Sequence, residues 1–399
     1  MLHRRLGWLD GLRAVAVLLV LYAHLSRYAF PGVRAVTSEW LHAGTAGVML
    51  FFLVSGYIIP ASLERHGDPR RFWAGRFRRL WPLYLVVVVA ATLIPTNPEM
   101  SAESAVAHLA MLPFLLNADL VTPVLWTLSF EMAFYLLVSA IHALGLRRID
   151  AYAGVTLAIL ATITAPLVSI GRDVTVPAVI ALIAGLAGIC GRRRWAVRAG
   201  GLALAGLTGW LLLTGMDPSH AWDGLLILAV MFTGTTIYRA DTGQTGWWPV
   251  LVTGTVVAAA LLTNWFAELR SLDGFTPRYV ARSVITLLVF AGAFALGMLT
   301  RRWRTPGWLA RIGVISYSLY LVHYVLLQAF GASIHGPLGA VLFLIALYGI
   351  CELTYRFIEL PGQRLGRGRT ISLPGHRRGA GPATPETITA ETGVARPGG

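Results

Sequence analysis

Long apolar segments recur along almost the whole chain, and this recurrence constrains the fold more than any other feature of the sequence. A helix needs about 20 predominantly apolar residues to cross a bilayer. Of the 399 residues, 56% are hydrophobic and 13% are charged, and the mean hydropathy is +0.65. The candidate spans are 8–30, 44–62, 80–96, 123–144, 152–170, 174–190, 199–215, 222–238, 247–265, 282–300, 310–330 and 336–357. The sequence therefore predicts an all-α polytopic membrane protein, a bundle of about 10–12 transmembrane helices with up to two re-entrant segments.

The charges between the spans predict the orientation of the chain. All 33 basic residues are arginine, and the formal net charge is +14. With the N-terminus inside, the arginines concentrate in alternate loops, as is typical of cytoplasmic loops. The loops then left outside hold only Arg27, Arg34, Arg172, Arg270, Arg278 and Arg282. We expect both termini in the cytoplasm of a multi-pass protein of the plasma membrane, with the lipid bilayer and no nucleic acid as a partner.

The last residues of the chain differ in composition from the rest. From Gly366 the sequence is rich in Gly, Pro, Thr, Arg and Ala and cannot bury a core. We predict an integral-membrane domain over 1–365 and a disordered cytoplasmic tail over 366–399. The two cysteines, Cys190 and Cys351, lie in apolar segments without CxxC spacing, so we expect neither a disulfide framework nor a metal site.

The first span carries three polar residues, Asp10, Arg13 and His24. Arg13 and His24 are 11 residues apart, so at about 100° per residue they share one helix face, about 16 Å from each other. Asp10 precedes Arg13 by one turn and can pair with it. A charge at membrane depth costs at least ~2.5 kcal/mol, which favours a polar cavity with a function. The alternative is that these side chains lie at the membrane interface.

Arg76 and Arg79 lie one helical turn apart just before the third span, at its predicted cytoplasmic end. Two guanidinium groups on one face suit a phosphate or pyrophosphate, because arginine binds such oxygens bidentately. The alternative is an anchor on anionic lipid.

Small residues interrupt the second span at Gly47, Ser55 and Gly56. Small residues in membrane helices allow close packing of neighbouring helices. The other interpretation is that they leave room for a ligand beside the first span.

The fourth span holds a carboxylate, Glu131, with Tyr135 one turn further on. An unpaired carboxylate within a membrane is either protonated or partnered. A histidine is the natural partner, and the alternative is a structural pair with Tyr135 or an arginine.

The eleventh span has Ser316, Tyr320 and His323 at i, i+4 and i+7, a polar stripe that either lines a cavity or bonds neighbouring helices. At the end of the last span, Arg356 and Glu359 are three residues apart. We expect them to form a cytoplasmic ion pair.

Taken together, these motifs resemble the membrane acyltransferase 3 family. The first-helix pattern of that family is a basic residue, ten further residues and a histidine, which Arg13 and His24 match. The other matches are GVMLFFLVSGYII, Arg76 and Arg79 before Pro82 and Tyr84, the segment 126–135, the segment 316–323, and Glu359 with Pro361. The resemblance covers roughly residues 6–365, and the motifs occur in the family's order and spacing.

The resemblance implies an enzyme that moves an acyl group, often acetyl, from cytoplasmic acyl-CoA to a hydroxyl of a carbohydrate or other glycosylated acceptor. Two positions depart from the usual pattern. Met132 stands where a second acidic residue is common, and Tyr324-Val325 follows His323 in place of His-x-Pro. In size and layout the chain resembles the stand-alone macrolide acyltransferases of antibiotic producers.

The residues and the resemblance together predict a membrane O-acyltransferase, with acyl-CoA, in the form of acetyl-CoA, as co-substrate and no metal. We expect His24 to act as general base and Glu131 to orient it. Arg13 would polarise the thioester carbonyl or hold the coenzyme arm, and Arg76 and Arg79 would bind the coenzyme phosphates. We expect the substrate pocket to include Asp10, Tyr135, Ser316 and His323.

Two other functions compete with this prediction. A membrane exporter of a glycoside or lipid-linked intermediate fits the polar residues within the spans, although the sequence has no inverted repeat or paired broken helices. A scaffold without a ligand is disfavoured by the buried charges. Residues in the outer loops are placed to contact a polar acceptor: Asp217, His220, Trp222, Asp223, Trp265 and Asp273.

Overall fold

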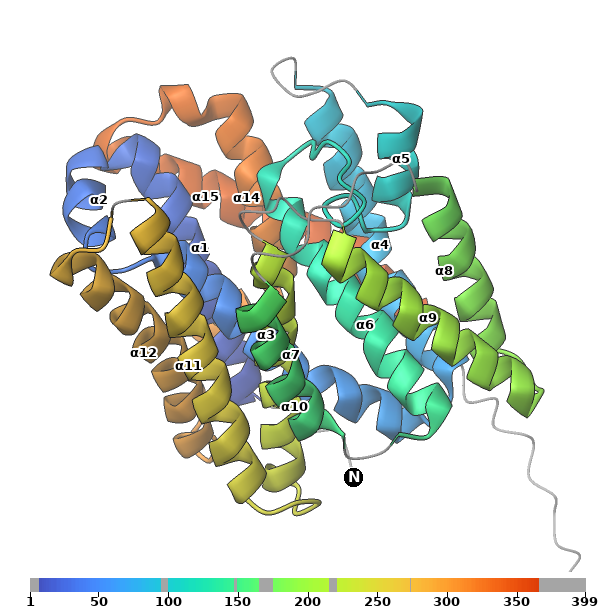
Figure 1. The fold of residues 1–399 in the computed structure, drawn as a ribbon. Helices are drawn as coiled ribbons and strands as arrows, with labels where there is room; N and C mark the ends of the chain where they lie inside the picture. The colour runs from blue at the N-terminus through green and yellow to red at the C-terminus, as the bar shows by residue number, and fades with distance from the viewer. Residues whose placement is uncertain are drawn as a thin grey trace, which may run out of the picture. The chain divides into compact units, whose positions relative to one another are not determined.

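The computed structural model describes residues 7–94, 100–146, 149–164, 175–214, 221–272 and 274–365. Every regular element in these ranges is a helix, and each predicted span overlaps one of them (Figure 1). The helices at the spans are α1 (Gly7–Ala29), α3 (Ala43–His66), α4 (Pro69–Thr92), α6 (Trp126–Leu144), α7 (Asp150–Thr164), α8 (Thr175–Ile189), α9 (Arg194–Thr214), α10 (Ala221–Asp241), α11 (Trp248–Ser271), α12 (Pro277–Leu299), α13 (Gly307–Val314), α14 (Ser316–Phe330) and α15 (Gly336–Thr354). Shorter elements are α2 (Pro31–Ser38), α5 (Ala102–Leu109), η1 (Pro123–Leu125), η3 (Gly331–Ser333), the π-helical turn η4 (Tyr355–Glu359) and α16 (Leu360–Leu365).

The helices confirm an all-α polytopic membrane protein. Seven of those described are long and apolar enough to cross a membrane, and α13 with α14 makes an eighth if the two form one bent span. The cytoplasmic location of the termini remains a prediction. The expected tail over 366–399 lies outside the described residues.

Helix α3 packs most extensively against α10 and α1. Glycines make these contacts possible. A Cβ atom at Gly56 would overlap the backbone carbonyl of Met231 on α10, and one at Gly47 would overlap that of Ala16 on α1. The small residues Gly47 and Gly56 therefore serve close helix packing, as one of the two interpretations predicted.

A sharp bend positions the polar stripe of α14. Helices α13 and α14 meet at an angle of 67°, and a Cβ atom at Gly313 would overlap the Asp10 carbonyl, so α13 lies tightly against the start of α1. The Tyr317 hydroxyl then donates a hydrogen bond of 2.8 Å to the Leu80 carbonyl and joins α14 to α4. Asp10 is buried at the α1–α13 contact, outside the lining described for the two cavities below.

Candidate active site

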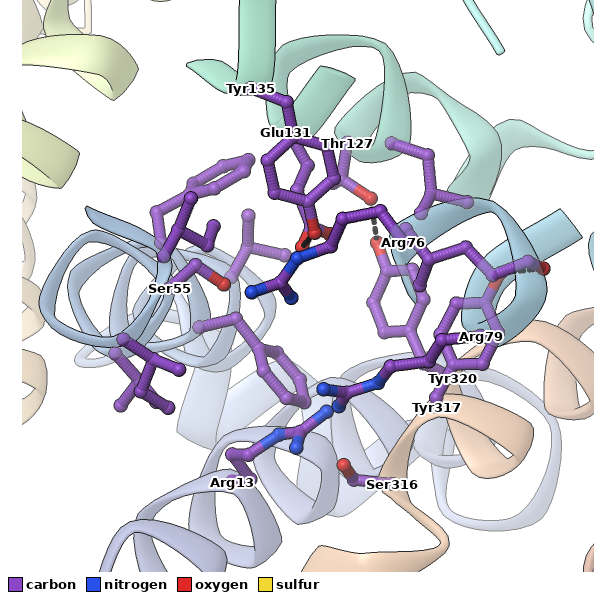
Figure 2. A pocket seen from close by; sticks show the side chains of 18 residues that line it. Arg13, Ser55, Arg76, Arg79, Thr127, Glu131, Tyr135, Ser316, Tyr317 and Tyr320 are labelled. Atoms are coloured by element: carbon purple, nitrogen blue, oxygen red, sulfur yellow. Dashed lines mark hydrogen bonds between the residues drawn. The ribbon is translucent and has the colours of Figure 1, made fainter. Parts of the chain in front are cut away.

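A narrow cavity of about 90 Å³ lies where α1, α3, α4, α6 and α14 meet (Figure 2), and we call it the inner cavity. Its polar lining is Arg13, Ser55, Arg76, Arg79, Thr127, Glu131, Tyr135, Ser316, Tyr317 and Tyr320. The structure therefore brings together six of the nine site residues expected from the sequence. These six come from four different helices.

Three guanidinium groups reach the inner cavity from two helices. Arg76 and Arg79 lie on successive turns of α4, and Figure 2 shows the groups of Arg13 and Arg79 turned toward one another. The Arg76 guanidinium carbon lies 5.2 Å from the ring centre of Tyr135. Within the described part of the chain, the buried Nε atom of Arg79 has no hydrogen-bond partner. Like charges this close repel one another in a low-dielectric site, and an anion between them removes that repulsion.

Two carboxylates lie near these arginines. Tyr135 donates a hydrogen bond to Glu131 from one turn further along α6, so the Glu–Tyr pair that was one alternative for this residue is formed. The second carboxylate, Glu359, is only 2% exposed and accepts a hydrogen bond from Ser318.

The expected ion pair between Arg356 and Glu359 is wrong. Arg356 instead lies 3.5 Å from Glu352, one turn back on α15. The reason is the π-helical turn η4, which changes the register after Thr354 and turns Glu359 into the bundle. An i,i+3 spacing read with an α-helical period could not anticipate that change.

A second cavity, of about 470 Å³, lies toward the other end of α1, and we call it the outer cavity. It is lined by His24 and by parts of α2, α3, η1, α12 and α14. The two cavities share Val48 and Tyr320 as lining residues. The Tyr320 hydroxyl is hydrogen-bonded to Thr127 at 2.9 Å, which fixes this ring between them.

His24 contacts a second, buried histidine, His323, behind the lining of this cavity. Its Nδ1 atom lies 3.3 Å from Nε2 of His323, and Nδ1 of His323 lies 2.9 Å from the Leu319 carbonyl. Because a carbonyl only accepts, Nδ1 of His323 carries the proton and its Nε2 is the acceptor. His24 must then donate from Nδ1, which leaves the lone pair of its Nε2 free.

The hydrogen bonds of Glu131 and His24 differ from the contact expected between these two residues. Among the described residues, Glu131 is bonded to Tyr135 in the inner cavity, whereas His24 lines the outer cavity and is bonded to the buried His323 behind it. The single polar chamber expected from the sequence is therefore two adjoining cavities. Ser316 and His323, expected together in the substrate pocket, lie on different sides of this division.

Sequence reasoning did not single out the arginines of the outer cavity, Arg27, Arg34 and Arg282. A signal was present, because all three lie in loops or helix ends predicted to be outside, where arginine is scarce in this chain. Of the outer-loop residues expected near an acceptor, Trp265 lines a cavity next to the outer one. The side chains of the other five lie outside the described part of the chain.

Comparison with known proteins places this architecture in a family. A family model described as an acyltransferase domain, acyltransferase 3, matches residues 6–356. The chain belongs to this acyltransferase family. The matched range includes the residues that line both cavities and the nine site residues expected from the sequence, whereas Glu359 lies just beyond it. No solved structure matches the chain.

Individual relatives match over shorter segments. Acyltransferase MdmB of Streptomyces mycarofaciens is 34% identical over 147 residues, which are 33% of this chain and 38% of the relative. O-acetyltransferase OatA of Staphylococcus aureus is 30% identical over 167 residues, 36% of this chain and 26% of the relative. The putative O-acetyltransferase SACOL0978 of the same species is 37% identical over 100 residues, 23% of this chain and 15% of the relative. The matched segments thus span less than two fifths of these curated relatives.

Proposed function

We propose that the protein is an O-acyltransferase of the plasma membrane. It transfers an acyl group, acetyl in the simplest case, from acyl-CoA to a hydroxyl of a carbohydrate or a glycosylated small molecule such as a macrolide. Membership of the acyltransferase family supports the acyl transfer. The observation that carries the proposal is the position of His24, which lines the outer cavity on the same helix that supplies Arg13 to the adjoining inner cavity.

The inner cavity suits the donor. Arg76 and Arg79 present guanidinium groups whose geometry suits phosphate oxygens. In the described chain, the buried Nε–H group of Arg79 has no hydrogen-bond acceptor. A volume of about 90 Å³ admits only a short stretch of the donor, so the nucleotide remains outside. Arg13 lies about 16 Å below His24 along the helix, which is too far to polarise the reacting carbonyl. We therefore assign Arg13 to holding the coenzyme arm.

The outer cavity suits the acceptor and the proton transfer. His24 Nε2 removes the proton from the acceptor hydroxyl, and the hydroxyl oxygen attacks the thioester carbonyl carbon. The carbon–sulfur bond then breaks, and the departing thiolate takes the proton back from His24. Because His323 accepts a hydrogen bond from His24 Nδ1, it holds the ring in the tautomer needed and stabilises the imidazolium that forms.

The test uses the purified full-length protein in nanodiscs with radiolabelled acetyl-CoA and a panel of sugars and glycosides. We expect a labelled ester, and we expect His24→Ala to lower its rate by about 10²–10⁴-fold. A His24→Ala protein that inserts normally and keeps the wild-type rate would overturn the assignment. If the wild type forms no ester but moves a glycoside across sealed vesicles, the exporter interpretation is correct instead.

A further inference from the structure

We propose that the outer cavity binds an anionic group of the acceptor, so that the acceptor is a hydroxylated sugar or glycan that also carries a carboxylate or phosphate. The transfer part of this inference rests on the proposed function, whereas the binding part does not.

The first argument is the charge of the cavity lining. Arg27, Arg34 and Arg282 all line the outer cavity, and the described lining contains no aspartate or glutamate. Glu39, which lies nearby on the chain, is bound instead by Arg278 at 2.9 Å. A cleft lined by one sign of charge focuses its field and attracts ligands of the opposite sign.

The second argument is that two of these arginines are held in place. Arg34 donates from Nη1 to the Ala23 carbonyl at 2.7 Å, directly before His24 in the chain. Arg282 donates from Nη1 to the Ser38 carbonyl at 3.3 Å. Each contact uses one donor and leaves the remaining N–H groups available. Pre-oriented guanidinium groups are the usual protein partners of carboxylate and phosphate.

The electrostatics at a neighbouring histidine agree with this arrangement. His42 precedes α3, outside the membrane-spanning segments, and lines the outer cavity. Burial lowers the pKa of His42, and the charges of Arg282 and Arg34 lower it further. The positive field in the cavity therefore comes from the arginines, and it acts on every group placed among them.

The distribution of arginine points the same way. Six arginines lie in segments predicted to face the outer, non-cytoplasmic side of the membrane. Three of these six line this single cavity. Since outside loops tend to avoid basic residues, a general need for positive charge does not explain the cluster. A ligand on that side does explain it.

Aromatic side chains indicate the sugar part of the acceptor. A further cavity of about 330 Å³ shares His42, Trp126 and Arg282 with the outer cavity and adds Trp265 and Glu268. Aromatic faces pack against the C–H face of a sugar ring, and polar groups at the edge select its hydroxyls. The outer cavity and this neighbour thus combine an anion site, two indoles and the proposed base.

Binding tests the inference without relying on catalysis. The probes are glucose 1-phosphate and glucuronic acid, compared with methyl glucoside, and the protein is the full chain in phosphatidylcholine nanodiscs. We expect both anionic probes to bind at least about tenfold more tightly than the neutral one, with an affinity that falls as salt rises. Arg34→Gln and Arg282→Gln should each remove most of this preference. The matched control is Arg278→Gln, which removes an exposed arginine of the same region that pairs with Glu39 and should retain the preference.

Further experiments distinguish the outer cavity from the inner cavity as the binding site, and an acceptor from a lipid headgroup as the source of the anion. A double variant, Arg76→Gln with Arg79→Gln, should keep the preference, because those residues line the inner cavity. Equal affinity for neutral and anionic probes, or a loss of preference only in this double variant, overturns the inference. Nanodiscs containing phosphatidylglycerol test lipid headgroups as the source of the anion. If anionic lipid abolishes probe binding, the site belongs to lipid and the inference is wrong.

The ester-forming assay with labelled acetyl-CoA distinguishes two outcomes: failure of the anion site and failure of the proposed acyl transfer. A higher kcat/KM for anionic acceptors, lost through KM in Arg34→Gln, supports both. Esterification of neutral acceptors with equal kcat/KM overturns the anion site and leaves the acyltransferase standing. Selective binding of anionic probes with no ester from any acceptor supports the site and overturns the proposed reaction.

Discussion

At the scale of single residues, the contact between His24 and His323 makes the most direct prediction. His323→Phe removes the acceptor for His24 Nδ1, and we expect kcat to fall about 10–100-fold while the KM for acetyl-CoA stays unchanged. His323→Gln retains a carbonyl oxygen and should restore part of kcat. Steady-state kinetics of both variants check this, and an equal loss in the two would show that His323 serves packing alone.

A second prediction concerns the arginines of α4 and the KM for the acyl donor. Arg79→Gln should raise the KM for acetyl-CoA by about tenfold with a smaller effect on kcat, because it removes a charge-assisted contact to a phosphate. Arg78→Gln is the control, since Arg78 lies next to it on α4 but is exposed and outside the inner cavity. Equal KM values for the two variants would favour the lipid-anchor interpretation.

Spacing within one helix predicted which residues of that helix act together, but not their partners on other helices. Arg76 and Arg79 share a cavity because residues one turn apart share a face, and Glu131 meets Tyr135 for the same reason. His24 and His323 are 299 positions apart, and their contact depends on how α1 packs against α14. From the sequence we expected Glu131 to orient His24 and placed His323 only in the substrate pocket, because no spacing rule relates residues on different helices.

At the scale of helices, the close approach of α3 and α10 predicts a large effect from a small change. Gly56→Ala should lower the free energy of unfolding by about 2 kcal/mol or more, because its Cβ atom would overlap the Met231 carbonyl. Gly206→Ala on α9 is the control, since nothing lies within 4 Å of an added Cβ there. Its expected effect is between neutral and about 1 kcal/mol stabilising. Thermal unfolding in detergent measures both.

A histidine on helix α5, His108, should make the stability of the protein depend on pH. His108 lies outside the membrane-spanning segments, and burial lowers its pKa, opposed in part by its hydrogen bond to the Asp119 carbonyl. The folded protein therefore binds a proton at His108 less readily than the unfolded chain, whose histidine pKa is about 6.5. This contribution to stability is present above about pH 6.5 and is lost as the pH falls below that value.

Thermal unfolding of wild type and His108→Asn between pH 8 and pH 5 measures that contribution. The wild type should lose more stability on acidification than the variant. Parallel curves for the two proteins would contradict the assignment to His108.

The positions of the helices were predictable, whereas their irregularities were not. Each apolar segment coincides with a helix, but seven or eight of the described helices are long and apolar enough to cross a bilayer, fewer than the 10–12 expected. The 67° bend before Ser316 and the π-helical turn before Leu360 have no counterpart in the hydrophobic pattern of the sequence. The bend places Ser316 in the lining of the inner cavity, and the π-helical turn buries Glu359, which bonds to Ser318.

At the scale of the helical unit, the two cavities predict that acetyl-CoA reacts from one face of the membrane alone. If the arginine-rich end faces the cytoplasm, acetyl-CoA added outside sealed, right-side-out vesicles should give no ester until the vesicles are permeabilised. Inverted vesicles should be active at once. A reporter protein fused to the C-terminus should independently report a cytoplasmic location. Full activity of intact right-side-out vesicles would place the donor site on the other face.

The ring of Tyr320 and the side chain of Val48 stand between the two cavities, and this has a consequence for the cell. A continuous water-filled passage through the bundle would short-circuit the gradient of ions across the bilayer. If the donor and the acceptor approach from opposite compartments, as the proposed reaction requires, this partition keeps the two cavities from joining into one open passage. Under that proposal, the acyl group of a cytoplasmic metabolite is delivered outward by a protein that is not a channel.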